Sequence, residues 1–215
     1  MRGKIGEVNS RCFQGLFSGL SPWLGILGLL ALPLVLSCGG GKAKPDSSGV
    51  PTTKPAPAHS PDRVHWTYEP DALQLTVYAD KELNSYEGYP HATKLCVYQL
   101  KTPEEFQKLA SNRSGVRELL KCKGFDASVV HFQKKFIQPG HNSTLSLDRA
   151  EGAKHVGLAA GYYDLNPGQV TRVYHIPVHK EETGHLWWSQ DNYTPGKLHM
   201  QLLFGPHSIQ RVGED

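Results

Sequence analysis

The sequence predicts an all-β protein, a two-sheet antiparallel β-sandwich with a helical insertion between its second and third strands. Seven segments after residue 64 have the apolar pattern of β-strands, and turns rich in Gly, Pro and Asn separate them. One stretch between the second and third segments has helical spacing instead. The composition, with 22 Gly, 15 Pro and nine Tyr in 215 residues, suits a β-rich extracytoplasmic domain.

The N-terminal segment has the organisation of a secretory signal peptide. Arg2, Lys4 and Arg11 precede an apolar run over residues 23–36, which is 14 residues long. A transmembrane anchor is the weaker alternative, because spanning a bilayer takes roughly 20 residues. The small residues before Cys38 resemble the bacterial lipobox, in which the cysteine thiol is diacylated and becomes the new N-terminus. A plain signal peptide with an incidental cysteine is the other alternative.

Lipidation of Cys38 would leave a linker between the membrane and the domain. By resemblance to other bacterial lipoproteins, a residue other than Asp after the cysteine, here Gly39, favours the outer membrane at its periplasmic face. We predict a signal peptide over 1–37, the lipidated cysteine and a disordered linker over 38–61, and the domain over 62–215. The linker has five prolines and only one large apolar residue, so it cannot bury a core.

The net charge argues against a nucleic-acid partner. The whole chain is +3, and residues 1–37 carry three bases and one acid, which leaves +1 for the remainder. The domain sequence has no basic stripe either, so we expect no nucleic-acid binding.

The first half of the domain begins with strands. Residues 73–79 alternate apolar and polar side chains, which predicts a half-buried strand. A turn-rich segment over 80–90 leads into a second strand over 92–100. Thr102-Pro103-Glu104-Glu105 then forms a capping box with Pro at the first helical position, so a helix is expected there. A second short helix carries its apolar stripe up to a stop at Gly124.

The second half returns to strands. Val130, Phe132 and Phe136 alternate with polar residues, which predicts a strand. Residues 155–163 are nearly all apolar and predict a central strand covered on both faces. The remaining strands are predicted around Leu145 and Leu147, over 170–178 and over 197–204.

Two cysteines belong to the domain. In an oxidising periplasm Cys96 and Cys122 predict a disulfide, with two buried free thiols as the alternative. Cys96 beside His91 could instead be a nucleophile and its base, but a thiol among apolar strand residues is inert.

No reactive constellation is found in the sequence. It contains no G-x-S-x-G elbow, Walker loop or H-E-x-x-H motif, so we expect neither an enzyme nor a cofactor other than the covalent lipid. His175 and His179 would lie about 13 Å apart on one strand, too far to share a metal ion. The charged corner at residues 148–151 is interpreted as solvated ion pairing.

Trp187 and Trp188 raise an alternative function, in which a periplasmic lipoprotein binds glycan or a small molecule on an aromatic platform. Adjacent residues on a strand point to opposite faces, however. We therefore expect one ring in the core and the other over a sheet edge.

The domain sequence resembles the type VI secretion system outer-membrane lipoproteins, the TssJ, SciN or VasD family. The likeness runs from about residue 73 to 210 and rests on the order of its parts. These parts are Tyr78-Ala79-Asp80, Leu83 to His91, Cys96 to Leu100, Phe125-Asp126, Gln138-Pro139-Gly140, Leu147 to Ala153, Ala160 to Tyr163, Ile176-Pro177-Val178 and Leu186-Trp187-Trp188.

The resemblance implies a transthyretin- or immunoglobulin-like sandwich tethered in the outer membrane. Members of the family bind the periplasmic C-terminal region of the large inner-membrane subunit TssM and so anchor the membrane complex. The loop between their first two strands is implicated in this contact, and residues 83–90 occupy that position here. The partner-binding residues implied are Leu83, Asn84, Ser85, Tyr86, Glu87 and Tyr89.

The residues of this loop support the same site. Tyr86 and Tyr89 lie among Gly and Pro in a turn, and Tyr is favoured at protein interfaces. In the alternative, Tyr86 folds back over the end of the sandwich as a plug.

Overall fold

The computed structural model describes residues 56–185 and 187–212. The predicted signal peptide, Cys38 and most of the predicted linker lie outside these residues. The described part contains the following elements: a 3-10 helix η1 (Pro61–Arg63), helices α1 (Glu104–Ala110), α2 (Arg113–Leu119) and α3 (Pro167–Val170), and strands β1 (Glu69–Ala79), β2 (Thr93–Leu100), β3 (Val129–Ile137), β4 (Ser143–Arg149), β5 (His155–Ala160), β6 (Thr171–His175), β7 (Val178–Thr183), β8 (Gln190–Pro195), β9 (Leu198–Phe204) and β10 (Ile209–Arg211).

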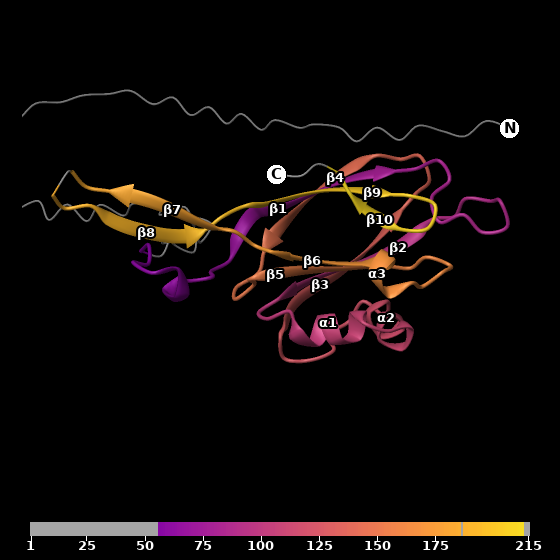
Figure 1. Cartoon of the computed structure of the whole chain (residues 1–215), viewed down its shortest axis with the longest axis horizontal. Helices are drawn as coiled ribbons and strands as arrows, with labels where there is room; N and C mark the ends of the chain where they lie inside the picture. The colour runs from indigo at the N-terminus through magenta and orange to yellow at the C-terminus, as the bar shows by residue number, and fades with distance from the viewer. Residues whose placement is uncertain (1–55, 186, 213–215) are drawn as a thin grey trace, which may run out of the picture. The chain divides into compact units, whose positions relative to one another are not determined.

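Two four-stranded sheets form the sandwich (Figure 1). The strand orders are β10-β9-β1-β4 and β3-β2-β5-β6, and one continuous hydrophobic core includes strands of both sheets. The predicted two-sheet, mostly β architecture is confirmed. It differs from the prediction in that β1 and β9 pair in parallel, whereas the other pairs are antiparallel.

Apolar alternation places β1 correctly. Leu73, Leu75 and Val77 are fully buried, while Gln74 and Thr76 between them are partly exposed. The pattern forms a strand because successive side chains point to opposite faces of a sheet and only one face of β1 meets the core. The predicted half-buried strand is confirmed.

The helical insertion lies between β2 and β3, as predicted, and α1 and α2 cover the outer face of their sheet (Figure 1). Phe106 of α1 packs so closely over Gly157 of β5 that a Cβ there would lie 2.6 Å from the aromatic ring. β2 and β5 are consequently buried on both faces. The capping box is wrong in detail, because α1 begins at Glu104 with Pro103 as N-cap and has no side-chain cap.

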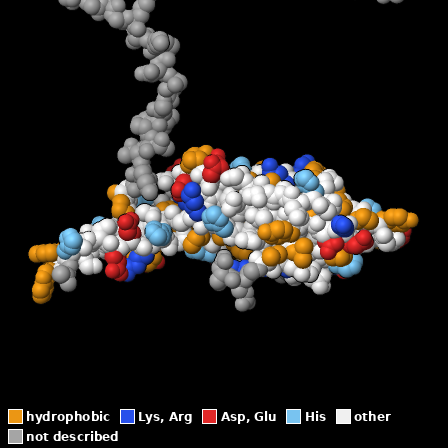
Figure 2. Space-filling model, turned by 90° about the horizontal axis from the view of Figure 1, so that it is seen from above, with side chains coloured by type: hydrophobic (Ala, Val, Ile, Leu, Met, Phe, Trp, Pro, Cys, Tyr) orange, Lys and Arg blue, Asp and Glu red, His pale blue; other side chains and the backbone are white. Residues whose placement is uncertain are grey.

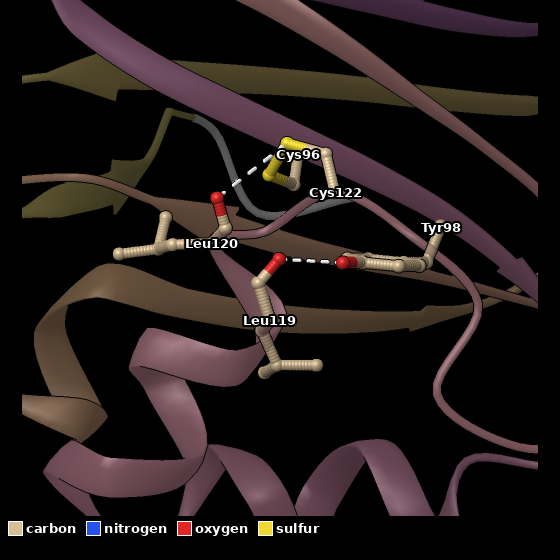
Figure 3. Close-up of a disulfide and its surroundings, with 5 residues drawn as sticks. All are labelled: Cys96, Tyr98, Leu119, Leu120 and Cys122. Atoms are coloured by element: carbon tan, nitrogen blue, oxygen red, sulfur yellow. Dashed lines mark hydrogen bonds between the residues drawn. A yellow bond between two sulfur atoms is a disulfide. The ribbon is translucent and has the colours of Figure 1, made fainter.

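A disulfide joins Cys96 of β2 to Cys122, and the predicted bond is confirmed (Figure 3). Cys122 has a φ of 49° and takes the left-handed position after α2 that the sequence assigned to Gly124. Beside it, the Tyr98 hydroxyl donates to the carbonyl of Leu119, and burial raises the Tyr98 pKa to about 12. Closing this loop, with a sequence separation of 26, stabilises the fold by about 3–4 kcal/mol in the chain-entropy model.

The second half of the domain matches the sequence analysis only in part. The strand predicted around Val130, Phe132 and Phe136 is confirmed as β3, on which Phe132 and Phe136 are exposed. The predicted strand over 170–178 is instead the end of α3, then β6 and the start of β7. The sequence did not predict the separate β7–β8 sheet or β10.

None of the helices in the described ranges combines the length and apolar character that crossing a membrane requires.

Candidate functional site

The loop between β1 and β2 is fixed to the end of the sandwich at its start. The Asp80 amide donates to the carbonyl of Phe204 at 3.0 Å, and the Leu83 amide donates to the Asp80 carbonyl at 3.1 Å. Leu83 is fully buried in the core, and its carbonyl accepts from the His91 amide at 2.9 Å. Both ends of the loop are therefore attached to the same core residue.

The tip of the loop is a tight two-residue turn. The amide of Tyr86 donates to the carbonyl of Tyr89 and the amide of Tyr89 to that of Tyr86, each at 3.0 Å. Glu87 has a φ of 52° and Gly88 a φ of 81°, the positive values that a type I′ hairpin turn requires. We call Tyr86–Tyr89 the tyrosine turn.

Asn84 supports the tyrosine turn from beneath. It is buried, with a φ of 51°, and its Oδ1 accepts from the amide of Tyr163 at 2.8 Å. Its neighbour Ser85 donates its own amide to the carbonyl of Pro206 at 3.0 Å. Three separate segments of the chain thus meet at this end of the domain.

Aromatic rings form the exposed surface at the tyrosine turn. The rings of Tyr86 and Tyr163 are stacked, with centroids 4.4 Å apart and an interplanar angle of 14°, and His91 meets Tyr163 edge-on at 4.9 Å. The exposed fractions are 48% for Tyr86, 71% for Tyr89 and 55% for Tyr163.

An open hollow of about 630 Å³ adjoins these rings. Its floor includes Tyr162, whose hydroxyl donates to the carbonyl of Ser208 at 3.0 Å and whose pKa is raised by burial. Asp164 at its rim pairs with Arg113 of α2 at 2.7 Å, whereas the described part of the chain provides no ion pair for Glu87, the other carboxylate of the lining. The hollow can accept an apolar or aromatic group with a polar or basic edge.

The six predicted partner-binding residues separate into two groups. Leu83 and Asn84 are buried and offer no surface to a partner, so their part is to position the turn. Ser85 is partly exposed, and Tyr86, Glu87 and Tyr89 are exposed. Tyr86 stacks on the exposed ring of Tyr163 and does not enter the core.

Tyr163 was not among the site residues predicted from the sequence. It was placed in the predicted central strand over 155–163, but β5 ends at Ala160. Tyr162 and Tyr163 then alternate, one buried and one exposed. The repeated Tyr directly before the Asp164–Pro167 turn was the available signal.

The structure also bears on the nucleophile and the metal site that were considered from the sequence. Cys96 is disulfide-bonded and cannot act as a nucleophile with His91. Within the described ranges, no group of three or more His, Cys, Asp or Glu side chains is arranged to hold a metal ion. The register of β5 and β6 does bring the rings of His155 and His175 to 4.9 Å. Burial, followed by the nearby His175, lowers the pKa of His155.

The predicted solvated corner is wrong for Arg149, which is 1% exposed. Its guanidinium donates to the carbonyl of Thr67 at 3.1 and 3.2 Å and to that of Gly196 at 3.3 Å, and it pairs with Glu69 at 2.9 Å. Gly196 directly follows β8, so Arg149 holds the base of the β7–β8 hairpin. Its neighbour Asp148 has a lowered pKa because it accepts hydrogen bonds, first from the Tyr68 hydroxyl and then from the Asp71 amide.

The prediction for the two adjacent tryptophans is also wrong. Trp187 and Trp188 lie in the turn between β7 and β8, not on a strand, and are 89% and 82% exposed. Neither ring enters the core.

Comparison with known proteins identifies a family whose model matches this chain. The model of a family described as "Type VI secretion lipoprotein, VasD, EvfM, TssJ, VC_A0113" matches residues 71–205, a range that includes the tyrosine turn and the β7–β8 hairpin. No curated protein matches the chain.

Solved structures also show similarity. Serratia marcescens Lip, a membrane-bound component of the type VI secretion system, is 20% identical, with a TM-score of 0.49, over 66% of this chain and 98% of that chain. The lipoprotein TssJ1 from Pseudomonas aeruginosa is 18% identical, with a TM-score of 0.47, over 69% and 97%. A chain of the structure described as "T6SS protein TssM C-terminal domain (869-1107) from EAEC" is 14% identical, with a TM-score of 0.48, over 66% and 98%.

Proposed function

The chain belongs to the type VI secretion lipoprotein family of VasD, EvfM and TssJ, and we propose that its tyrosine turn binds the periplasmic C-terminal region of the large inner-membrane subunit TssM. As a family member it is a membrane-bound, structural component of the secretion membrane complex and not an enzyme. Beyond family membership, we propose which partner the protein binds, which surface binds it and which membrane holds the lipid.

The assignment of the tyrosine turn as the partner-binding surface rests on one observation. The stacked pair of Tyr86 and Tyr163 is exposed, yet the buried Asn84 fixes it from below. Aromatic side chains that are ordered before binding lose little conformational entropy when a partner arrives. Tyr is also among the residues that dominate interface energies. A rigid tyrosine surface therefore suits a specific protein contact.

The tether supports the same assignment. We propose that Cys38 carries the lipid and that the outer membrane holds it, as the sequence around the cysteine indicates. Cys38 and Ala58 are 20 positions apart, and Ala58 is the first of the described residues that pairs with a strand of the domain; a chain of this length reaches about 70 Å when fully extended. The domain can thus meet a partner that rises from the inner membrane while it stays attached to the outer one.

The binding test measures co-purification and affinity of the lipidated chain with the C-terminal region of TssM. Tyr86→Ala is expected to weaken binding about 30-fold, which corresponds to the roughly 2 kcal/mol of a hot-spot aromatic. Tyr68→Ala is the matched control, since Tyr68 is 53% exposed but precedes the opposite end of β1. Unchanged affinity in both Tyr86→Ala and Tyr163→Ala would place the contact elsewhere.

The tether has its own test. Cys38→Ser should move the protein from the membrane fraction to the soluble periplasmic fraction without unfolding the domain. A Cys38→Ser protein that stays in outer-membrane fractions would exclude lipidation of Cys38 as the attachment.

A further inference from the structure

The β7–β8 hairpin is a separate two-stranded sheet that extends beyond one end of the sandwich (Figure 1). The turn between its strands carries the exposed Trp187 and Trp188, and we call its described residues, 184–185 and 187–189, the tryptophan tip. Figure 2 shows hydrophobic side chains gathered at the outer end of this hairpin. The two indole rings are therefore presented to the surroundings of the domain.

The tryptophan tip is a formed turn. The amide of Trp188 donates to the carbonyl of His185 at 2.8 Å. Gly184 has a φ of 117°, and a Cβ at this position would collide with the carbonyl oxygen of Trp188. Only glycine fits this geometry, so the chain is shaped to turn here and to present the rings that follow.

The strands behind the tip are polar, so the rings do not continue an apolar core. Lys180 pairs with Glu182 at 3.0 Å and with Asp191 at 3.1 Å across the hairpin. With Glu181, the two strands carry one base and three acids, a net charge of −2 when His is neutral. An apolar tip on polar, weakly acidic strands suits a surface into which indole rings can insert. Such a surface should not be strongly anionic, because it would then repel the acidic strands.

The chain from the lipidation site joins the domain on this same hairpin. Ala58 pairs with Tyr193 of β8 through two backbone hydrogen bonds of 3.0 and 2.7 Å. The tyrosine turn, in contrast, lies beyond the far end of β1, whose 11 residues span about 36 Å. The tethered end of the domain is thus the tryptophan end.

We propose that Trp187 and Trp188 insert into the interfacial layer of the membrane that holds the lipid anchor, as a second and non-covalent membrane contact. Trp is enriched at membrane–water interfaces, where the ring is buried and the indole N–H stays hydrated. The tether keeps the tip at high effective concentration near the bilayer, so a weak interfacial contact is sufficient. The inserted tip turns the tyrosine turn away from the membrane and toward the periplasm. The proposal rests on the lipid anchoring of the proposed function.

The test uses tryptophan fluorescence of the lipidated chain, purified from membranes and reconstituted in phosphatidylcholine vesicles with or without brominated acyl chains. Trp23 lies in the predicted signal peptide and is absent from the lipidated form. Trp66→Phe leaves only the two tip rings, and Trp187→Ala/Trp188→Ala leaves only Trp66, which is partly buried against the core. If Trp66→Phe does not fold, the difference between the wild type and the double variant reports the tip alone.

The tip emission is expected to fall about twofold on brominated lipid, most strongly when the bromine lies about 5–10 Å below the headgroups. The Trp66 emission should not change. Replacing the vesicle lipid with phosphatidylglycerol should leave tip quenching equal or weaker, because the hairpin stem is acidic; stronger quenching would overturn the charge argument.

Three other outcomes overturn the insertion itself. One is equal emission from tip rings in brominated and plain vesicles while the protein still floats with them, which separates failure of the tip from failure of the anchor. Another is a tip response only to soluble peptidoglycan fragments, which would identify a carbohydrate ligand. The third is an unquenched tip whose double variant no longer co-purifies with the TssM region, which would identify a protein contact.

Discussion

The two ends of the domain present exposed aromatic rings in different ways. At the tyrosine turn, Tyr86 stacks on Tyr163, and a buried Asn84 joins the turn to a second segment of the chain. At the tryptophan tip, Trp187 and Trp188 are almost fully exposed, and the described residues provide no aromatic partner for either ring. One end supports its rings from below, and the other supports only the backbone that carries them.

This difference separates two kinds of recognition. A specific protein surface requires rings in fixed positions, because misplaced rings leave gaps that a partner cannot fill. A fluid surface such as a bilayer interface adapts to the rings, so their own packing matters less. The following variants test whether support and exposure differ between the ends as described.

The largest effect is expected at the base of the hairpin. Arg149→Met should lower the free energy of unfolding by roughly 3 kcal/mol, since the carbonyls of Thr67 and Gly196 would lose buried, charged donors. Urea denaturation measures the loss. Lys180→Met, which removes the exposed ion pairs with Glu182 and Asp191 on the same hairpin, should cost less than about 1 kcal/mol and serves as the control. Equal losses would show that the base is no better supported than the strands.

A smaller effect is expected beneath the tyrosine turn. Asn84→Ala removes the acceptor of the Tyr163 amide and places Ala at a positive φ, so it should destabilise the domain by about 1–2 kcal/mol. It should also weaken partner binding, because the stacked pair loses its support.

Asn84→Gly separates these two causes. It loses the same hydrogen bond but tolerates the positive φ, so it should recover about 1 kcal/mol of the loss seen with Ala. Urea denaturation and co-purification with the TssM region measure both properties. Wild-type affinity in Asn84→Ala would contradict the positioning role of Asn84.

How far the sequence predicted these features depends on where the deciding contacts lie. Leu73 to Val77 were predicted correctly because alternation along one strand reports the core face it meets. Arg149 was misjudged because its partners, Thr67 and Gly196, lie 82 and 47 residues away. The local sequence around Arg149 resembles a polar turn.

The hairpin and the tyrosine pair show the same limit. No residue of strands β7 and β8 is fully buried, so they carry no apolar alternation from which a strand could be predicted. The loop between β1 and β2 was located from turn residues, but which of its side chains face outward depends on contacts with Tyr163 and Pro206. Local periodicity cannot report such contacts.

A further, smaller effect on stability is expected from the protonation of His155. His155 has a lowered pKa through burial and then His175, with Glu104 and Lys154 also nearby. The unfolded chain therefore binds the proton more tightly than the folded one. The stability this group contributes is complete above its unfolded pKa of about 6.5 and is lost as pH falls below it.

Urea midpoints at about pH 7.5 and about pH 5.5 measure this effect. His155→Gln should flatten the pH dependence. If His155→Gln keeps the wild-type slope, another group causes the acid sensitivity.

The smallest effect on stability is expected at the tryptophan tip. Trp187→Ala/Trp188→Ala should change the free energy of unfolding by less than about 0.5 kcal/mol, because the two rings bury almost no surface in the folded domain. Trp66→Ala is the contrasting control. Trp66 lies against the core and over the Arg149 guanidinium at 5.9 Å, so its removal should cost about 3 kcal/mol. Thermal and urea unfolding of the three proteins give the comparison. A large loss in the tip variant would mean that the rings stabilise the fold, and their exposure could then no longer be explained by an external surface.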